Sequence, residues 1–173
     1  MALRTISVCT GVGMLDVGLE LAFGDLRPIV YIEREIQAAT RLAARIEEGS
    51  LPAAPIWSDL TTFDAGRFRG MVDLICGGLP CQPFSVAGRR RGENDERYIW
   101  NDFSRIVEEC RPTLVALENV PGILQFFEPI GERLSGLGYR FEAGIWSAAE
   151  VGASHRRERF FCLGFLGNSK QQR

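Results

Sequence analysis

The sequence lacks the cysteine and histidine patterns that mark disulfide-bonded and zinc-binding proteins. Its five cysteines are odd in number and include no C-x-x-C pair, and His155 is the only histidine. Spacings of this kind indicate neither a disulfide framework nor a zinc site. We therefore expect a protein of a reducing compartment that holds no metal.

Long apolar runs are also missing. No segment approaches the length of a membrane span, and the first residues do not form a charged start followed by an apolar stretch. These absences predict a cytoplasmic protein without a signal peptide or a membrane partner. There are no internal repeats, and 173 residues with 46% hydrophobic content predict one domain with a single core.

The chain alternates strand and helix patterns. Short apolar runs predict strands at 5–9, 29–32, 72–76 and 113–117, and a further short strand that ends near Trp57. Apolar residues at helical spacing predict helices at 15–23, 35–48, 99–109 and 125–137. Two more strands are expected around a turn near residues 152–154. This order predicts an α/β fold with a mostly parallel, doubly wound sheet and an antiparallel strand late in the chain.

The predicted strand at 72–76 leads into the sequence Gly77-Gly78-Leu79-Pro80-Cys81-Gln82-Pro83-Phe84-Ser85. Its glycines and prolines force a stiff turn that holds Cys81 at the carboxyl end of a strand, where open α/β sheets carry out their chemistry. A thiolate is a strong nucleophile, so an exposed cysteine at this place is a candidate for covalent catalysis. A Pro-Cys pair taken alone is more typical of a structural cysteine.

This nine-residue run resembles the catalytic loop of the DNA cytosine-5 methyltransferases. Other motifs of that family follow in the family's order, from about Ile6 to about Phe165. The resemblance implies a Rossmann-like, S-adenosylmethionine-dependent methyltransferase fold with Cys81 as the nucleophile. It also places Gln82 among the catalytic residues and Pro80 among those that bind the cofactor.

A glycine-containing turn follows the first predicted strand. Its residues are Cys9, Thr10, Gly11, Val12, Gly13 and Met14. Glycines let a ligand approach the backbone, but a dinucleotide fingerprint would need glycine where Asp16 stands. The turn instead resembles the family's Phe-x-Gly-x-Gly motif, which binds S-adenosylmethionine, with Cys9 in place of Phe and Met14 in place of a usual Gly. An ordinary tight turn between strand and helix is the alternative.

Two acidic residues follow consecutive predicted strands. Glu33 ends the strand at 29–32, and Asp59 follows the strand near Trp57. The resemblance implies that Glu33 accepts hydrogen bonds from the ribose hydroxyls of the cofactor, and that Asp59 accepts one from the adenine amino group. Either residue taken alone is more typical of a helix cap or a solvated acid.

Glu118 and Asn119 follow the apolar strand at 113–117. A carboxyl group at the end of such a strand is expected to be partly desolvated, which favours its protonated form. The sequence Glu-Asn-Val matches the family motif in which the Glu contacts N3 of the target cytosine and the Asn helps to fix the nucleophile loop. The alternative is that Glu118 caps the turn before the next helix.

The sequence Arg157-Glu158-Arg159 resembles the family's Gln-x-Arg-x-Arg motif, with His155 where Gln is usual. Alternate residues of a strand share a face, so we expect Arg157 and Arg159 to point the same way. The resemblance implies that Arg159 contacts cytosine O2 and that Arg157 positions the loop or a phosphate. Two solvated arginines on an edge strand are the alternative. We assign no catalytic role to His155.

An excess of positive charge is absent, because the formal net charge is −2. Proteins that bind DNA normally present a basic face. Here the arginines gather in two clusters, at 89–91 and at 156–159. Such clusters are usually solvated, but the position of the first beside Cys81 favours a groove for double-stranded DNA.

Members of the family continue after the position of Phe165 with a target-recognition domain and terminal motifs. We therefore expect residues 1–167 to form a C-terminally truncated S-adenosylmethionine-binding catalytic domain, and residues 168–173 a polar tail. Three origins stay open: a truncated gene, half of a split enzyme completed by a second chain with the recognition domain, and a degenerate remnant of a bacterial or phage restriction-modification locus. A tRNA cytosine-5 methyltransferase and a non-catalytic S-adenosylmethionine-binding fragment are the alternative functions.

Overall fold

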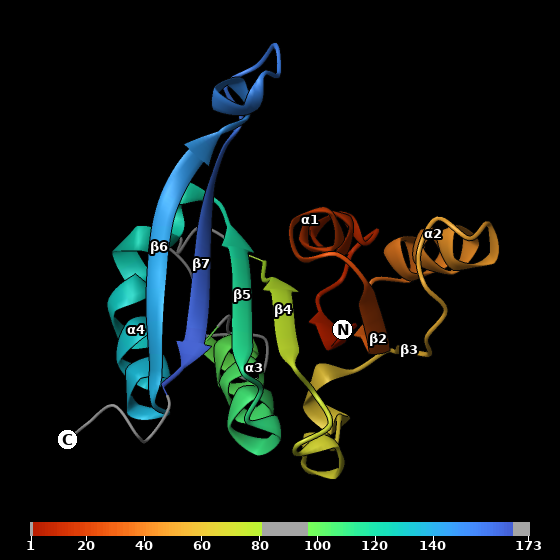
Figure 1. Cartoon of the computed structure of the whole chain (residues 1–173), viewed down its shortest axis with the longest axis horizontal. Helices are drawn as coiled ribbons and strands as arrows, with labels where there is room; N and C mark the ends of the chain where they lie inside the picture. Colours follow the sequence, from red (N-terminus) through yellow and green to blue (C-terminus); the bar gives the residue numbers. More distant parts are fainter. Residues whose placement is uncertain (1, 81–96, 168–173) are drawn as a thin grey trace, which may run out of the picture.

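The computed structural model describes residues 2–80 and 97–167, which form a seven-stranded sheet flanked by helices (Figure 1). The elements in chain order are β1 (Leu3–Val8), α1 (Met14–Phe23), β2 (Leu26–Ile32), α2 (Ile36–Glu47), β3 (Ile56–Trp57), η1 (Leu60–Thr62), η2 (Ala65–Phe68), β4 (Leu74–Gly78), α3 (Arg97–Cys110), β5 (Leu114–Asn119), η4 (Pro121–Phe126), α4 (Phe127–Gly136), β6 (Tyr139–Ser147), η5 (Ala148–Val151) and β7 (Glu158–Leu166). The strand order is β3-β2-β1-β4-β5-β7-β6, and β7 alone runs antiparallel to its neighbours. The predicted α/β class and late antiparallel strand are confirmed.

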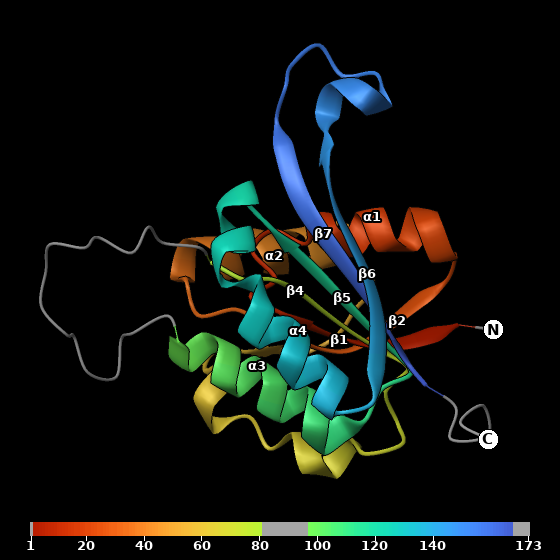
Figure 2. The same cartoon turned by 90° about the vertical axis from the view of Figure 1, so that its left-hand side faces the viewer.

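Helices cover both faces of the sheet, α1 and α2 on one and α3 and α4 on the other (Figure 2). The alternation of side chains along a strand explains this arrangement. In β4, Leu74 and Cys76 belong to the cluster that packs against Leu15 and Leu19 of α1. The residue between them, Ile75, lies in the core that contains the buried face of α3. The central strands are therefore buried on both faces, as a doubly wound sheet requires.

Strand β4 begins and ends two residues later than the sequence predicts. Gly77 and Gly78 continue the strand because they pair with Leu117 and Glu118 of β5. A Cβ at Gly77 would lie 3.1 Å from the ring of Phe103 and 3.3 Å from the Val8 carbonyl, so any larger residue would crowd the strand's neighbours here. The glycines thus carry the strand to the edge of the sheet, instead of starting the turn.

The helix predicted at 125–137 is shorter than expected. The 3₁₀ helix η4 precedes it and begins at Pro121, whose fixed φ and missing N–H suit the first turn of a helix. The α-helical part, α4, then covers Phe127–Gly136. Its buried side packs on the sheet through Ile130 and Leu134.

One face of β6 and β7 carries exposed aromatic side chains. Phe161 and Phe165 are each 39% exposed and Trp146 is 49% exposed, and the Trp146 and Phe161 rings lie 6.0 Å apart between centroids. In Figure 1, α4 lies behind β6 and β7, and no helix of the described ranges is drawn in front of these two strands. A membrane-crossing helix is not among the helices described: each is too short or too polar to span a bilayer.

Candidate active site

The candidate site lies at the edge of the sheet where β1, β2, β4 and β5 end. Parallel neighbours bring their carboxyl ends to one edge, and the order β2-β1-β4-β5 sets these four ends side by side. Because β7 runs in the opposite direction, its first residues reach the same edge (Figure 1). Residues that are far apart in the sequence are thereby brought together.

An ion pair between Glu118 and Arg159 occupies this edge. Arg159 Nε lies 2.8 Å from Glu118 Oε1, and the two side chains are 22% and 29% exposed. Arg159 Nη1 also donates to the carbonyl of Glu158 at 2.7 Å. A Cβ at Gly78 would lie 3.4 Å from Glu118 Oε2, so the carboxylate sits directly against the end of β4. The carboxylate is therefore half-buried and charge-paired, and it faces the strand that leads to Cys81.

Asn119 ties the ends of β4 and β5 together. Its side chain is buried, its Nδ2 donates to the Leu79 carbonyl at 2.9 Å, and its Oδ1 accepts from the Val120 N–H at 2.8 Å. Leu79 is followed by the exposed Pro80, the last residue before the undescribed segment. Cys81, Gln82 and the arginine cluster at 89–91 lie outside the described residues.

Burial keeps the four described cysteines in the thiol form. It raises the pKa of Cys9 to about 11, and the neighbouring charge of Glu33 adds to this effect. It raises the pKa of Cys162 to about 11 and that of Cys110 to about 12. The pKa of the fully buried Cys76 is also well above its ordinary value for the same reason. Since a thiol attacks as thiolate, none of these four is suited to nucleophilic catalysis at neutral pH.

The glycine turn after β1 has a left-handed backbone at three positions. Gly11 and Gly13 have φ of +59° and +79°, and Cys9 has a positive φ of 51°. A Cβ at Gly13 would lie 2.5 Å from Leu51 Cδ1, whereas one at Gly11 would meet nothing within 4 Å. A side chain at Gly13 would therefore force Leu51 to move, whereas the space over Gly11 is open.

Two side chains, one from the turn itself and one from α2, hold this turn in place. The Thr10 hydroxyl donates to the Ser7 carbonyl at 3.0 Å, which ties the turn to β1. From α2, Arg45 donates to the Val12 carbonyl and lies 3.4 Å from the Met14 sulfur. The turn is thus tied both to β1 and to α2.

Glu33 binds the glycine turn directly. The Gly11 N–H donates to Glu33 Oε2 at 2.7 Å, and the Glu35 N–H donates to Glu33 Oε1 at 2.7 Å. The Glu33 backbone N–H donates to the Trp57 carbonyl at 2.9 Å, which joins the ends of β2 and β3. A carboxylate has about four acceptor positions, so each oxygen can accept one further hydrogen bond. Sequence reasoning missed the contact with Gly11, for which no local pattern exists.

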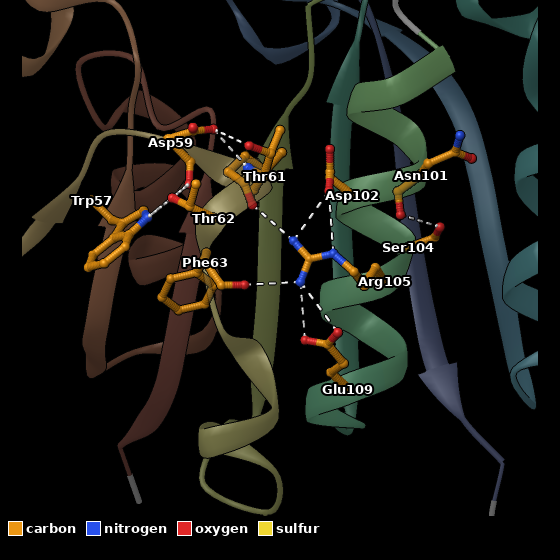
Figure 3. A network of polar contacts seen from close by, with 11 residues as sticks. Trp57, Asp59, Thr61, Thr62, Phe63, Asn101, Asp102, Ser104, Arg105 and Glu109 are labelled. Atoms are coloured by element: carbon orange, nitrogen blue, oxygen red, sulfur yellow. Dashed lines mark hydrogen bonds and ion pairs between the residues drawn. The ribbon is translucent and has the colours of Figure 1, made fainter. Parts of the chain in front are cut away.

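Asp59 caps the short 3₁₀ helix η1. Its Oδ1 accepts hydrogen bonds from the Thr61 N–H at 2.9 Å and from the Thr61 hydroxyl at 2.8 Å (Figure 3). These bonds, with a smaller contribution from the charge of Arg34, hold the pKa of Asp59 below its ordinary value. In the described part of the chain Oδ2 has no hydrogen-bond partner. The cap that the sequence suggested as an alternative is present, and one oxygen is left over for a ligand.

Arg157 and Arg159 occupy different environments. Strand β7 begins at Glu158, so Arg157 lies one residue before it, exposed, with its carbonyl accepting from the Ala148 N–H at 3.0 Å. Within the described ranges no side chain binds the Arg157 guanidinium. Of the pair predicted to point the same way, only Arg159 contacts Glu118.

A buried polar cluster beneath the glycine turn was not predicted. Asp16, in the first turn of α1, is only 6% exposed. Its Oδ2 accepts from the Ser7 hydroxyl at 3.0 Å, and its Oδ1 lies 3.8 Å from Cys76 Sγ. Desolvation raises the pKa of Asp16. The only sign of this cluster in the sequence is the polar Ser7 inside an apolar strand.

Among the described residues, no group of three acidic, histidine or cysteine side chains is arranged to hold a metal ion.

Comparison with known proteins identifies the family. Residues 3–172 match the model of the C-5 cytosine-specific DNA methylases. The type II methyltransferase M.NgoMIV of Neisseria gonorrhoeae is 32% identical over 164 residues, which are 92% of this chain and 50% of that protein. M.CviJI of Paramecium bursaria Chlorella virus IL3A is 30% identical over 166 residues, 94% of this chain and 43% of that protein. The chain thus spans about half the length of these relatives.

The fold has a close counterpart among solved structures. The crystal structure of the S. pombe Dnmt2 methyltransferase superposes with a TM-score of 0.79 over 96% of this chain and 52% of that one. At 23% identity this likeness shows the fold alone. The fold, the edge of the sheet that gathers Glu118, Asn119 and Arg159, and the match over residues 3–172 agree, and the chain belongs to the C-5 cytosine-specific DNA methylase family.

Proposed function

We propose that this chain carries the catalytic machinery of a DNA cytosine-5 methyltransferase, which transfers a methyl group from S-adenosylmethionine to C5 of a cytosine in double-stranded DNA. The observation that carries the proposal is the Glu118–Arg159 pair, 2.8 Å apart, set against Gly78 at the end of β4. That strand continues within three residues to Cys81. A nucleophile and two groups that stabilise charge are thus assigned to one edge of the sheet.

The residues at the ends of β1, β2 and β3 fit an adenosyl cofactor. The open space over Gly11 admits a ligand to the backbone, and Glu33 offers acceptor positions that suit vicinal hydroxyl groups. The ionised Asp59, with Oδ2 left over by its cap, suits an amino group. We assign the ribose to Glu33, the adenine amino group to Asp59, and contacts along the turn to residues 9–14 and Pro80. When bound, S-adenosylmethionine supplies an electrophilic methyl group.

The charge-paired site supports addition of a thiolate to a pyrimidine. The Cys81 thiolate forms a bond to C6 of cytosine, and the electron pair of the C5–C6 double bond moves toward N3 and O2. When the cytosine binds, Arg159 turns from the Glu118 carboxylate to donate a hydrogen bond to O2, and Glu118 takes up a proton from solvent. Glu118 then passes this proton to N3. C5, now electron-rich, gains the methyl group. Water then takes the C5 proton, and the electron pair of the C5–H bond re-forms the C5–C6 double bond as the C6–S bond breaks, which frees the thiolate. N3 returns its proton to Glu118, which leaves neutral 5-methylcytosine.

Two requirements follow from this chemistry. A stacked base does not expose C6 to a thiol, so the cytosine must be flipped out of the duplex. The nucleophile must also be held at a fixed place, and the contact of Asn119 with the Leu79 carbonyl anchors the segment that leads to it. We assign Arg157 and Gln82 to positioning the loop or a phosphate.

Sequence recognition is assigned to a part outside these 173 residues. The chain spans about half of its relatives, and its net charge of −2 is unfavourable for gripping DNA. The exposed Trp146, Phe161 and Phe165 form an apolar face of the kind that a further domain or a second chain covers. We propose that the recognition half binds this side of the molecule.

The proposed mechanism is tested with duplex DNA that contains 5-fluorocytosine, because fluorine at C5 cannot leave as a proton. The chain, supplied with S-adenosylmethionine and with any partner that carries the recognition half, should form an adduct that survives denaturing electrophoresis. Cys81→Ser should abolish it, while Cys110→Ser, at a buried thiol, should leave it intact. An adduct that persists in Cys81→Ser contradicts the assignment. An adduct with tRNA but not DNA would favour the tRNA enzyme, and cofactor binding without any adduct would favour the non-catalytic fragment.

A further inference from the structure

Arg105 of α3 reaches across to the short helix that Asp59 caps. Its Nη2 donates to the Leu60 carbonyl at 3.0 Å and its Nη1 donates to the Phe63 carbonyl at 3.0 Å (Figure 3). These two carbonyls stand at the beginning of η1 and directly after it. One guanidinium therefore grips both ends of a helical turn of three residues.

Apart from Arg105 and the cap, η1 is held mainly by its own residues and by Trp57. The Trp57 indole N–H donates to the Asp59 carbonyl at 2.8 Å and to the Thr62 hydroxyl at 3.2 Å, and the Thr62 hydroxyl donates to the Asp59 carbonyl at 3.1 Å. Leu60 packs against the core, and the backbone bond from the Phe63 N–H to the Leu60 carbonyl is 3.4 Å long. All three residues of η1 are at least partly exposed. So short a 3₁₀ segment has little stability of its own.

Arg105 is itself held in one orientation. Asp102 accepts from its Nε at 3.3 Å, and Glu109 accepts from its Nη1 at 3.2 Å. These acids lie three residues before and four residues after it on α3, and all three side chains are no more than 33% exposed. The planar guanidinium is thus pre-oriented before it meets the two carbonyls.

We propose that Arg105 is a positioning residue for the adenine end of the cofactor site: by clamping η1 it holds the Asp59 carboxylate where it accepts from the adenine amino group. The inference rests on the proposed function, in which Asp59 has that role. If Arg105 only joined α3 to η1, its loss would lower the folding stability and weaken the binding of every ligand by the same factor. If Arg105 positions Asp59, its loss also reduces the preference for cofactors that carry the amino group over cofactors that lack it.

The first measurement needs no cofactor. The two Thr61 bonds hold the pKa of Asp59 below its ordinary value, so carboxyl ¹³C NMR of the 173-residue chain reports whether η1 keeps its shape. In Arg105→Met the pKa of Asp59 should rise toward the ordinary value. Arg133→Met is the matched control. Arg133 lies on α4 and forms an ion pair with Glu108 of α3 at 2.6 Å, so this variant also removes an arginine contact of α3 but leaves η1 unchanged. An Asp59 pKa that is unchanged in Arg105→Met overturns the proposal.

The second measurement is calorimetric binding of S-adenosylhomocysteine and of S-inosylhomocysteine, in which a carbonyl oxygen replaces the adenine amino group. The wild-type chain should prefer the adenosyl compound by at least about tenfold, the effect of one charge-assisted hydrogen bond. Asp59→Asn and Arg105→Met should both reduce this preference to less than about threefold, and the double variant should reduce it no further. Arg105→Lys keeps the positive charge but cannot donate to two carbonyls with a planar guanidinium, so its preference for the adenosyl compound should lie between those of the wild type and Arg105→Met.

The outcomes separate the two hypotheses. If the wild-type preference exists and Asp59→Asn removes it but Arg105→Met keeps it, the role of Arg105 is wrong and that of Asp59 stands. If the wild-type chain shows no preference or no binding, both are wrong. Circular dichroism of Arg105→Met and Arg105→Lys establishes that each variant is folded, and the intermediate value for the lysine variant distinguishes clamping from global loosening.

Discussion

Replacement of Glu33 tests two roles of one carboxylate. In Glu33→Ala the N–H groups of Gly11 and Glu35 each lose a charged acceptor at 2.7 Å. Water replaces part of what is lost, so we expect the free energy of unfolding to fall by about 2–4 kcal/mol. The acceptor for the ribose hydroxyls disappears as well. Loss of a charged acceptor corresponds to about 1.5–3 kcal/mol, or a roughly 10- to 150-fold weaker binding of S-adenosylhomocysteine.

The assays are urea unfolding for stability and titration calorimetry for affinity, both on the 173-residue chain. Glu35→Ala is the matched control. The Glu35 side chain accepts from the Gln37 and Ala38 N–H groups as the N-cap of α2. Its loss should lower the unfolding free energy by about 1 kcal/mol and leave the affinity unchanged.

Glu33→Gln separates the two roles of Glu33. Its amide has one oxygen, so one of the two backbone N–H groups would face an NH₂ group that cannot accept. We expect this variant to be no more stable than Glu33→Ala, despite its closer shape. The reasoning is refuted if Glu33→Ala unfolds like the wild type, since Gly11 then does not depend on the carboxylate. It is also refuted if affinity falls equally in Glu35→Ala.

Three further results are expected. At pH 8, iodoacetamide should label the native chain at Cys81 alone, detected by peptide mass spectrometry, because burial keeps the other thiols protonated. Gly11→Ala should cost about 1–2 kcal/mol in urea unfolding for its positive φ, and Gly13→Ala about 1–3 kcal/mol more, since its Cβ meets Leu51 at 2.5 Å. The pKa of Asp16 is raised in the folded state, so protonation of Asp16 favours folding. Relative to Asp16→Asn, the free energy of unfolding of the wild type should rise as the pH falls through the folded-state pKa of Asp16. The rise should be complete below the unfolded-state pKa of about 3.9. Equal pH profiles of the two proteins would show that Asp16 is not desolvated.

Much of the fold follows from local patterns. The apolar run at 113–117 predicts β5, and the helical spacing at 35–48 predicts α2, each to within a few residues. A strand that is buried on both faces gives a continuous apolar run, whereas a helix that is buried on one face gives apolar residues every three or four positions. The sequence predicts an end of β4 at Cys76, two residues before the observed end at Gly78, and the difference has a physical reason. Glycine usually weakens a strand, but at Gly77 it avoids the crowding that a Cβ would meet from Phe103 at 3.1 Å and the Val8 carbonyl at 3.3 Å. That crowding is tertiary and has no local sign.

In the candidate site, too, the sequence predicts which residues belong but not what they contact. The family motifs predict the site residues Glu33, Asp59, Glu118 and Arg159, and the contacts of each become visible only in the structure. The clamp of Arg105 on Leu60 was beyond sequence reasoning, because the two residues are 45 positions apart and Arg105 resembles any solvated arginine of an amphipathic helix. The carboxylate of Glu33 likewise binds a residue 22 positions away.

The place of β7 between β5 and β6 has a consequence for how the protein forms on the ribosome. Strand β6 pairs only with β7 among the described strands, so when β6 leaves the ribosome it has no partner in the sheet. Until β7 follows, β5 remains an open edge, and Glu118 has no counter-charge from Arg159. The β6–β7 hairpin therefore adds to the sheet as one late unit that closes the edge and completes the charge pair in a single event. A nascent chain that carries every residue up to β6 has the carboxylate of Glu118 but not its partner Arg159, so under the proposed function the site is completed only when β7 is in place.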